Sequence, residues 1–164
     1  MSVRSFNNHI LILILCCFSV NLASQSSHKL LRQGNKFYDI EEFGLAEEKY
    51  RKSQNTESQS KTAYNLGNAL YKQGRFEEAV EAYQQASSGN MENQEKAKIF
   101  HNLGNAQLQS QKLEEALAAY KQSVRLNPND PETLHNLMLT QQMMKMQQQQ
   151  QQQQQGQSGD SQDQ

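Results

Sequence analysis

The strongest constraint in this sequence is a set of three residue series that recur with the same spacing. Each series repeats after 33 and then 37 residues, with an alanine twelve residues after each glycine and a tyrosine four residues further on. Such agreement predicts three copies of one supersecondary unit, stacked so that each copy buries its neighbour's apolar face. The three series are Gly34, Gly67 and Gly104; Ala46, Ala79 and Ala116; and Tyr50, Tyr83 and Tyr120.

The composition favours helices and excludes several functions. Only 2 prolines and 8 glycines occur in 164 residues, which disfavours a turn-rich β fold. The mean hydropathy of -0.90 excludes a polytopic membrane protein. Because 16 Lys and Arg face 17 Asp and Glu, no basic field is present to bind nucleic acid. Phosphate-binding loops, Ser/His/Asp sets and zinc-protease motifs are missing from the sequence, so we expect no enzyme and no cofactor.

Each unit is predicted to be a helix A, a tight turn and a helix B. Gly67 and Ala79 should lie where helices A and B approach most closely, and Leu66, Leu70 and Tyr83 should fill the rest of the interface. The four extra residues of the second interval fall in a loop around Ser87–Asn90. The predicted helix pairs are 27–40 with 43–54, 60–73 with 76–88, and 93–110 with 113–126.

A final helix is predicted from Pro131 to about Lys145. Asp130 is placed to cap it, Pro131 suits the first helical position, and Glu132 favours the helix dipole. The pair Asn136-Leu137 repeats the pattern of helix A, but Met138 replaces the glycine. This helix should therefore cover the end of the stack, as terminal units of solenoids do.

The spacing resembles the tetratricopeptide repeat, a helix-turn-helix unit of about 34 residues. The resemblance implies an all-α, right-handed solenoid of three repeats plus a C-terminal capping helix. Its domain would span residues 28–146, with repeats over 27–55, 60–90 and 93–128 and the capping helix over 131–146. Proteins of this family typically bind partner proteins or peptides in a concave groove lined by the A helices.

The resemblance also implies which side chains line that groove. With each glycine counted as position eight, the positions that face the groove include two, five, six, nine and twelve. The candidate residues come from the first four of these: Arg32, Asn35, Lys61, Tyr64, Asn65, Asn68, Lys98, His101, Asn102, Asn105, His135 and Asn136. The asparagines form two rows that could pair with the peptide bonds of an extended partner. They could equally serve local hydrogen bonds within the repeats.

Two narrower readings of the groove remain open. The carboxylate clamp that holds chaperone C-terminal tails is matched at Asn35, Asn65 and Lys98, but Leu31 and Asn102 replace two of its cations. His101 and His135 occupy equivalent positions on neighbouring helices and could bind a metal ion or another ligand. Clustered carboxylates and cysteines that would complete a metal site are missing from the sequence around them, so exposed groove histidines are the simpler interpretation.

The two ends of the chain differ from the repeats. Residues 1–24 read as a signal peptide or an N-terminal membrane anchor, because Arg4 precedes the apolar run Ile10–Phe18 and small residues follow. Both cysteines lie there, and Leu15 disfavours a lipoprotein site at Cys16. Residues 147–164 begin with an unbroken glutamine run and are predicted to be disordered.

An exported three-repeat chain with a glutamine-rich end is similar to the repeat proteins of Bacteroides aerotolerance (Bat) operons. Tyr64–Gly74, Phe100–Asn105 and Arg125–Asp130 carry that similarity. It implies a non-catalytic adaptor in the cell envelope, periplasmic or anchored to the inner membrane, with envelope or integral membrane proteins as partners. Two alternatives are an assembly factor that acts through an uncleaved N-terminal segment, and a metal- or ligand-binding envelope protein that uses the groove histidines.

Overall fold

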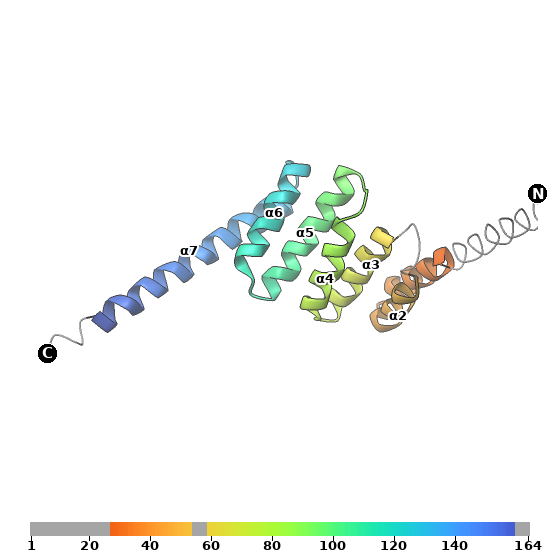
Figure 1. The fold of residues 1–164 in the computed structure, drawn as a ribbon, viewed down its shortest axis with the longest axis horizontal. Coiled ribbons are helices and arrows are strands. Elements are labelled where there is room, and N and C mark those ends of the chain that lie inside the picture. Colours follow the sequence, from red (N-terminus) through yellow and green to blue (C-terminus); the bar gives the residue numbers. More distant parts are fainter. Residues whose placement is uncertain (1–26, 54–58, 160–164) are drawn as a thin grey trace, which may run out of the picture.

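The computed structural model describes residues 27–53 and 59–159, with side chains described up to residue 152. These residues form one continuous stack of helices in chain order, with no strand among them (Figure 1). Residues 27–39 are helical, and the later helices are α2 (Phe43–Ser53), α3 (Gln59–Lys72), α4 (Phe76–Ser87), α5 (Asn93–Gln109), α6 (Leu113–Leu126) and α7 (Pro131–Gly159). The predicted A and B helices of all three repeats are therefore present, and the longer second interval lies in the loop over 88–92.

The helices form two layers. Helix A of one repeat contacts helix A of the next, since α5 touches both α3 and α7, whereas the backbones of the described B helices α2, α4 and α6 do not approach one another closely. The A helices must therefore lie on the inner, concave side of the stack, and the B helices on the outer side. The positions expected to line a groove are carried by this inner layer.

The recurring glycine and tyrosine pack directly against each other. Gly67 lies under the ring of Tyr83, and a Cβ built on Gly67 would be 2.6 Å from Cε1 of that ring. The same relation joins Gly34 to Tyr50 and Gly104 to Tyr120. The alanine of the series, Ala79, is fully buried, but it is the tyrosine ring that requires the glycine. The sequence interpretation placed Gly67 at the closest approach of two helices, and the structure identifies the ring as its neighbour.

The three turns between helices A and B share one backbone conformation. Glu41, Gly74 and Gln111 have φ values of 62°, 74° and 59°, in the left-handed region. In each turn the next N–H donates to a carbonyl five residues earlier, as from Arg75 to Leu70 at 3.0 Å. Only the middle turn has a glycine there, so the other two carry a backbone strain of about 1 kcal/mol each.

Helix α7 begins as predicted. The Asp130 Oδ1 accepts the backbone N–H of Glu132 at 3.1 Å, and Oδ2 accepts the hydroxyl of Thr133 at 2.6 Å. The hydrogen bond from the Thr133 hydroxyl is the main cause of the lowered pKa of Asp130. Burial opposes the shift, and the backbone N–H groups of Thr133 and Glu132 add to it. Asp130 is thus a confirmed N-cap, held in its charged form.

Helix α7 is longer than the predicted capping helix, and this corrects the prediction of disorder from residue 147 onward. The helix continues through the glutamine run to Gly159, and Figure 1 shows it projecting away from the stack. Glutamine has a helix propensity close to that of Lys or Glu, and an existing helix is extended at little cost. Gln147, Gln148 and Gln151 line a pocket of about 430 Å³ beside the start of α6. Residues 160–164 lie outside the described residues.

The predictions for the N-terminal segment also fall outside the described part of the chain, which starts at residue 27. Within that part, every helix is too short or too polar to span a lipid bilayer.

Candidate functional site

A ladder of hydrogen bonds runs along the concave layer and joins each repeat to the next. The Asn65 amide donates to Asn35 Oδ1 at 3.0 Å, and the Asn102 amide donates to Asn68 Oδ1 at 2.9 Å. The capping helix continues the pattern, because the Asn136 amide donates to Asn105 Oδ1 at 3.0 Å. The two predicted rows of asparagines are therefore brought together, with position six as donor and position nine as acceptor.

The same acceptor oxygens also receive the phenols of the recurring tyrosines. The Tyr50 hydroxyl donates to Asn35 Oδ1 at 2.9 Å, Tyr83 to Asn68 at 2.8 Å and Tyr120 to Asn105 at 2.7 Å. Burial raises the pKa of all three tyrosines well above its usual range. The phenols thus remain protonated donors, and each position-nine asparagine is fixed by its own repeat and by the next one.

The ladder leaves part of the amides available to a ligand. Within the described residues, the Oδ1 atoms of Asn65 and Asn102 and the Nδ2 atoms of Asn35 and Asn68 have no hydrogen-bond partner. Acceptors and donors of this kind alternate along the groove, which suits the C=O and N–H groups of an extended backbone. The two interpretations of the asparagines are compatible for these four residues, because one side of the amide serves local bonds and the other side has no partner within the described residues. Asn105 differs, since its Nδ2 lies 3.0 Å from His101 Nε2.

His101 is buried, which corrects the expectation of exposed histidines in the groove. Only 8% of it is exposed, because the capping helix covers it. Its Nδ1 lies 2.6 Å from the Thr133 hydroxyl, and its Nε2 accepts the Asn105 amide at 3.0 Å. Since Thr133 donates in turn to Asp130, Nδ1 carries the proton in this arrangement. His101 therefore helps to attach α7 to the third repeat.

The hypothesis of a metal site finds no support among the described residues, where no three His, Cys, Asp or Glu side chains are grouped to hold an ion. Both ring nitrogens of His101 are already engaged, and His135 is exposed on α7.

The remaining predicted residues lie along the edges of the groove. Tyr64 is half-buried and its hydroxyl accepts the Asn102 amide at 3.2 Å. Lys61 is exposed and pairs with Glu95 at 3.3 Å, while Arg32 and Lys98 are exposed. These cations therefore border the groove without forming a single charged cluster.

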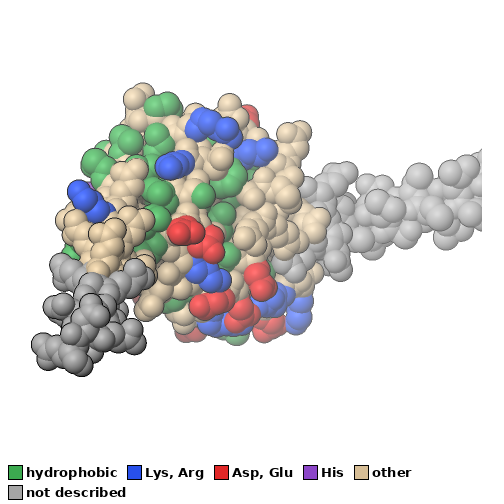
Figure 2. Space-filling model, turned by 60° about the vertical axis from the view of Figure 1, so that its left-hand side comes forward, with side chains coloured by type: hydrophobic (Ala, Val, Ile, Leu, Met, Phe, Trp, Pro, Cys, Tyr) green, Lys and Arg blue, Asp and Glu red, His purple; other side chains and the backbone are tan. Residues whose placement is uncertain are grey.

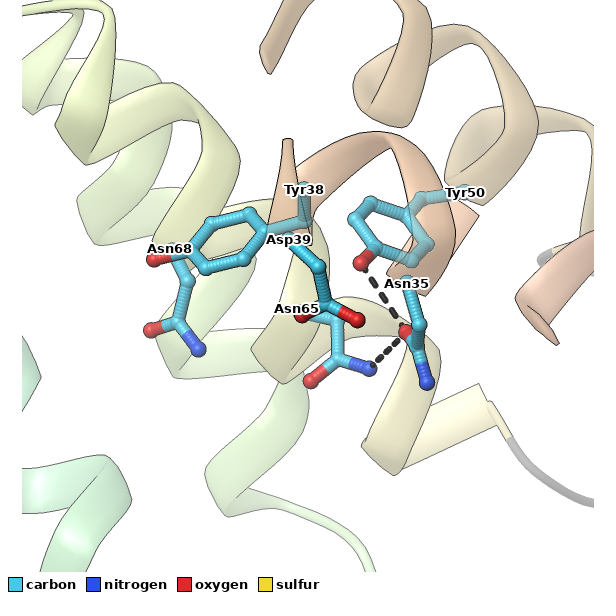
Figure 3. A pocket seen from close by; sticks show the side chains of 6 residues that line it. All are labelled: Asn35, Tyr38, Asp39, Tyr50, Asn65 and Asn68. Atoms are coloured by element: carbon cyan, nitrogen blue, oxygen red, sulfur yellow. Dashed lines mark hydrogen bonds between the residues drawn. The ribbon is translucent and has the colours of Figure 1, made fainter. Parts of the chain in front are cut away.

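Two adjoining pockets open along the ladder. The first, of about 250 Å³, is lined by Asn35, Tyr38, Asp39, Tyr50, Asn65 and Asn68, and Figure 3 shows these side chains around it. The second, of about 200 Å³, is lined by Tyr38, Asn68, Tyr71, Lys72, Tyr83, Asn102 and Asn105. Because they share Tyr38 and Asn68, the two pockets form one continuous groove across the three repeats.

Six residues that line the pockets were not predicted as groove residues: Tyr38, Asp39, Tyr50, Tyr71, Lys72 and Tyr83. Tyr50 and Tyr83 were identified in the sequence only as members of the repeating tyrosine series. Tyr38 and Tyr71 stand 33 residues apart, as do Asp39 and Lys72, so they obey the same period as the glycines. Position twelve was expected to face the groove, and applying the period there would have found Tyr38 and Tyr71.

Outside the groove, acidic and basic side chains lie intermingled on one part of the surface, in the lower part of Figure 2. Arg75 pairs with Glu47 and with Glu78, each at 2.6 Å, and so joins α2 to the start of α4. The Arg75 hydrogen bond is the main cause of the lowered pKa of Glu78. For Glu47, burial opposes the shift, but hydrogen bonds from Arg51 and Gln73 and the charge of Arg75 still lower its pKa. This network joins the first repeat to the second and engages the carboxylates of Glu47 and Glu78.

The comparisons with known proteins agree with this geometry. Residues 64–131 match the family model of the tetratricopeptide repeat. No curated protein shows significant sequence similarity to the chain.

Several solved structures have a similar fold, and two of them are about a quarter identical in sequence to the chain. One is the first repeat domain of Spaghetti (RPAP3) bound to the HSP90 peptide SRMEEVD, with 25% identity, a TM-score of 0.68, and coverage of 74% of this chain and 94% of that one. Another is Pseudomonas aeruginosa pilF, with 26% identity, a TM-score of 0.67, and coverage of 87% and 64%. A third is MamA, with 22% identity, a TM-score of 0.65, and coverage of 70% of this chain and 66% of that one. This similarity supports the fold alone. Residues 64–131 thus carry tetratricopeptide repeats, and the chain folds as an all-α tetratricopeptide-repeat solenoid.

Proposed function

We propose that this chain is a non-catalytic adaptor that holds an extended segment of a partner protein in its concave groove. The observation that carries the proposal is the row of groove-facing amide atoms left unpaired by the ladder, on Asn35, Asn65, Asn68 and Asn102. A ligand that offers alternating donors and acceptors would satisfy them, and an extended peptide does so at every residue. Tetratricopeptide repeats generally mediate protein–protein interaction, and the similar Spaghetti domain holds a peptide.

The groove is better suited to an internal segment than to a C-terminal carboxylate. Of the clamp positions, Asn35 and Asn65 are tied together in the ladder, and Asn102 replaces a cation. Leu31 replaces a second cation, so Lys98 alone would face a terminal carboxylate. Charge-assisted hydrogen bonds supply much of the affinity for carboxylates, and most of that assistance is missing here.

Site-specific crosslinking in the native cell tests this function. A photo-crosslinking residue replaces Lys72 in the groove or, as the matched control, Lys121 on the outer helix α6; both lysines are exposed and lie on helices. We expect discrete adducts with one or a few proteins from position 72 and none of these from position 121. The purified partner should then bind the chain and lose at least about tenfold in affinity on Tyr71→Ala. Identical adducts from both positions would overturn the proposal.

We further propose that the adaptor acts in the cell envelope, within a membrane complex of the Bat type. The apolar run Ile10–Phe18 and its flanks support export, and the similarity to Bat repeat proteins supports membrane partners. N-terminal sequencing of the protein from fractionated cells tests this. A chain that starts near Ser24 in the periplasmic fraction supports a cleaved signal, whereas Met1 in the membrane fraction favours the anchored assembly factor. An intact chain in the cytoplasm contradicts both.

A further inference from the structure

The two pockets are the same site repeated once along the solenoid. Each is formed by positions nine, twelve and thirteen of one repeat, the tyrosine of its helix B, and positions six and nine of the next repeat. A third equivalent step lies between the last repeat and α7, where the Asn136–Asn105 hydrogen bond continues the ladder. By the same register, the equivalent positions there hold Asn105, Leu108, Gln109, Tyr120, Asn136 and Leu139.

The first two steps differ in the charge at position thirteen. Asp39 lines the first pocket, and in Figure 3 its carboxylate is drawn among the amides. Lys72 lines the second pocket. Both side chains are exposed, and neither has an ion pair with any described residue, in contrast to Lys61 and Arg75. A ligand could therefore meet an unpaired anion and then an unpaired cation.

The third step differs from the first two because position thirteen holds the uncharged Gln109 and two leucines are present. Leu108 stands where Tyr38 and Tyr71 line the earlier pockets, and Leu139 replaces the position-nine asparagine. Leu139 is 41% exposed, and Met143, one turn further along α7, is 40% exposed. Hydrophobic side chains also reach the surface at this end of the stack in Figure 2. Exposed leucine and methionine beside a polar groove can bury one apolar side chain of a ligand.

From this order we propose that the groove recognises an extended segment that carries a basic, an acidic and an apolar side chain, counted from the first repeat towards α7. The inference rests on the proposed function, which it narrows to a ligand class. Neighbouring A helices are in contact, so their axes lie about 10 Å apart. An extended chain in the polyproline II conformation advances about 3.1 Å per residue and makes one turn every three residues. Side chains three residues apart therefore point to the same side and lie about one helix spacing apart.

Designed peptides with blocked ends test the order by fluorescence anisotropy against the full chain. Lys-Ser-Ala-Glu-Ser-Ala-Leu and its reverse, Leu-Ala-Ser-Glu-Ala-Ser-Lys, present the proposed order in the two possible chain directions. Glu-Ser-Ala-Lys-Ser-Ala-Leu and its reverse have the same composition but exchange the charges. We expect one of the first two to bind at least about tenfold more tightly than both charge-exchanged peptides, with an advantage that shrinks in high salt.

Two sets of variants separate recognition from folding. Asp39→Lys with Lys72→Glu should reverse the preference, so that a charge-exchanged peptide binds more tightly; this gain of binding cannot come from a damaged fold. The better-binding peptide should also bind more tightly than the same peptide with serine in place of its leucine. Leu139→Asn should remove this advantage. Leu134→Asn is the matched control, since Leu134 is 36% exposed on another face of α7 and should leave that advantage unchanged.

The outcomes distinguish this inference from the function on which it rests. Equal binding of all four peptides, or an unchanged preference in the charge-exchanged variant, overturns the order and leaves the groove as a general peptide site. No peptide binding together with specific crosslinks from position 72 also overturns the order alone. No peptide binding together with no groove crosslinks overturns both.

Discussion

At the scale of single residues, the most demanding positions are those where two repeat series meet. Gly67 exists because the ring of Tyr83 occupies the space of its missing side chain, and the phenol of the same tyrosine fixes Asn68. One tyrosine thus links the core to the floor of the groove. The glycine, the tyrosine and the asparagine were all visible in the sequence as periodic residues. Their contact with one another was not visible, because a periodic pattern shows which positions are equivalent and does not show which residues touch.

Gly67→Ala should lower the free energy of unfolding by about 1–3 kcal/mol, because the fully buried ring of Tyr83 cannot move aside. Gly44→Ala is the matched control, since a Cβ there would meet nothing within 4 Å. That change should leave stability unchanged or raise it by up to about 1 kcal/mol through helix propensity. Urea denaturation followed by circular dichroism measures both. Equal effects of the two substitutions would contradict the packing described for Gly67.

At the scale of elements, the starts of helices could be predicted from the sequence better than the packing of side chains between helices. Asp130 and Pro131 marked the start of α7 correctly, since capping is a local property of the chain. The burial of His101 was missed, because it depends on how α7 packs against α5. The extent of α7 was missed too, since a glutamine run has the composition of disordered segments and the propensity of a helix.

The cap of α7 gives the molecule part of its acid sensitivity. A carboxyl whose pKa is lowered on folding stabilises the native state above its unfolded pKa, and this stability is lost as pH falls through the folded pKa. Asp130→Ala should lower stability at neutral pH by about 1 kcal/mol. Asp130→Asn keeps an acceptor oxygen and should therefore lose less stability at neutral pH than Asp130→Ala. It should also reduce the difference in unfolding free energy between about pH 7 and about pH 3, because the asparagine does not titrate. An unchanged acid dependence in Asp130→Asn would show that the carboxylate charge is irrelevant.

At the scale of the whole molecule, the fold class and the repeat number followed from three series of small and aromatic residues. The position of the groove followed only through the resemblance to a known repeat, and its two rows of amides were found in this way. The pairing of each amide, the position-thirteen charges and the leucines of the last step needed three-dimensional neighbours. Asp39 and Lys72 illustrate this, because their importance comes from sharing pockets with the ladder.

The two parts of α7 should contribute unequally to the stability of the stack. A chain that ends at residue 146 loses the glutamine run, which is exposed as far as residue 152, together with the polar residues after it. Its thermal midpoint should shift by less than about 2 °C. A chain that ends at residue 130 also loses the buried Thr133 and Thr140 and uncovers His101. Its midpoint should fall by at least about 5 °C, as expected for a loss of about 1 kcal/mol or more. Differential scanning calorimetry compares the two, and equal midpoints would refute the capping role of α7.

The ladder ends differently at its two termini, and this limits how copies of the chain can associate. Each step needs an asparagine oxygen at position nine and an amide donor at position six of the next unit. At the far end Leu139 stands at the acceptor's position and has no oxygen to offer, and at the near end the donor position holds the charged guanidinium of Arg32 in place of an amide. A second copy placed end to end would therefore find no matching step, and the pattern that joins repeats within one molecule cannot propagate into a filament.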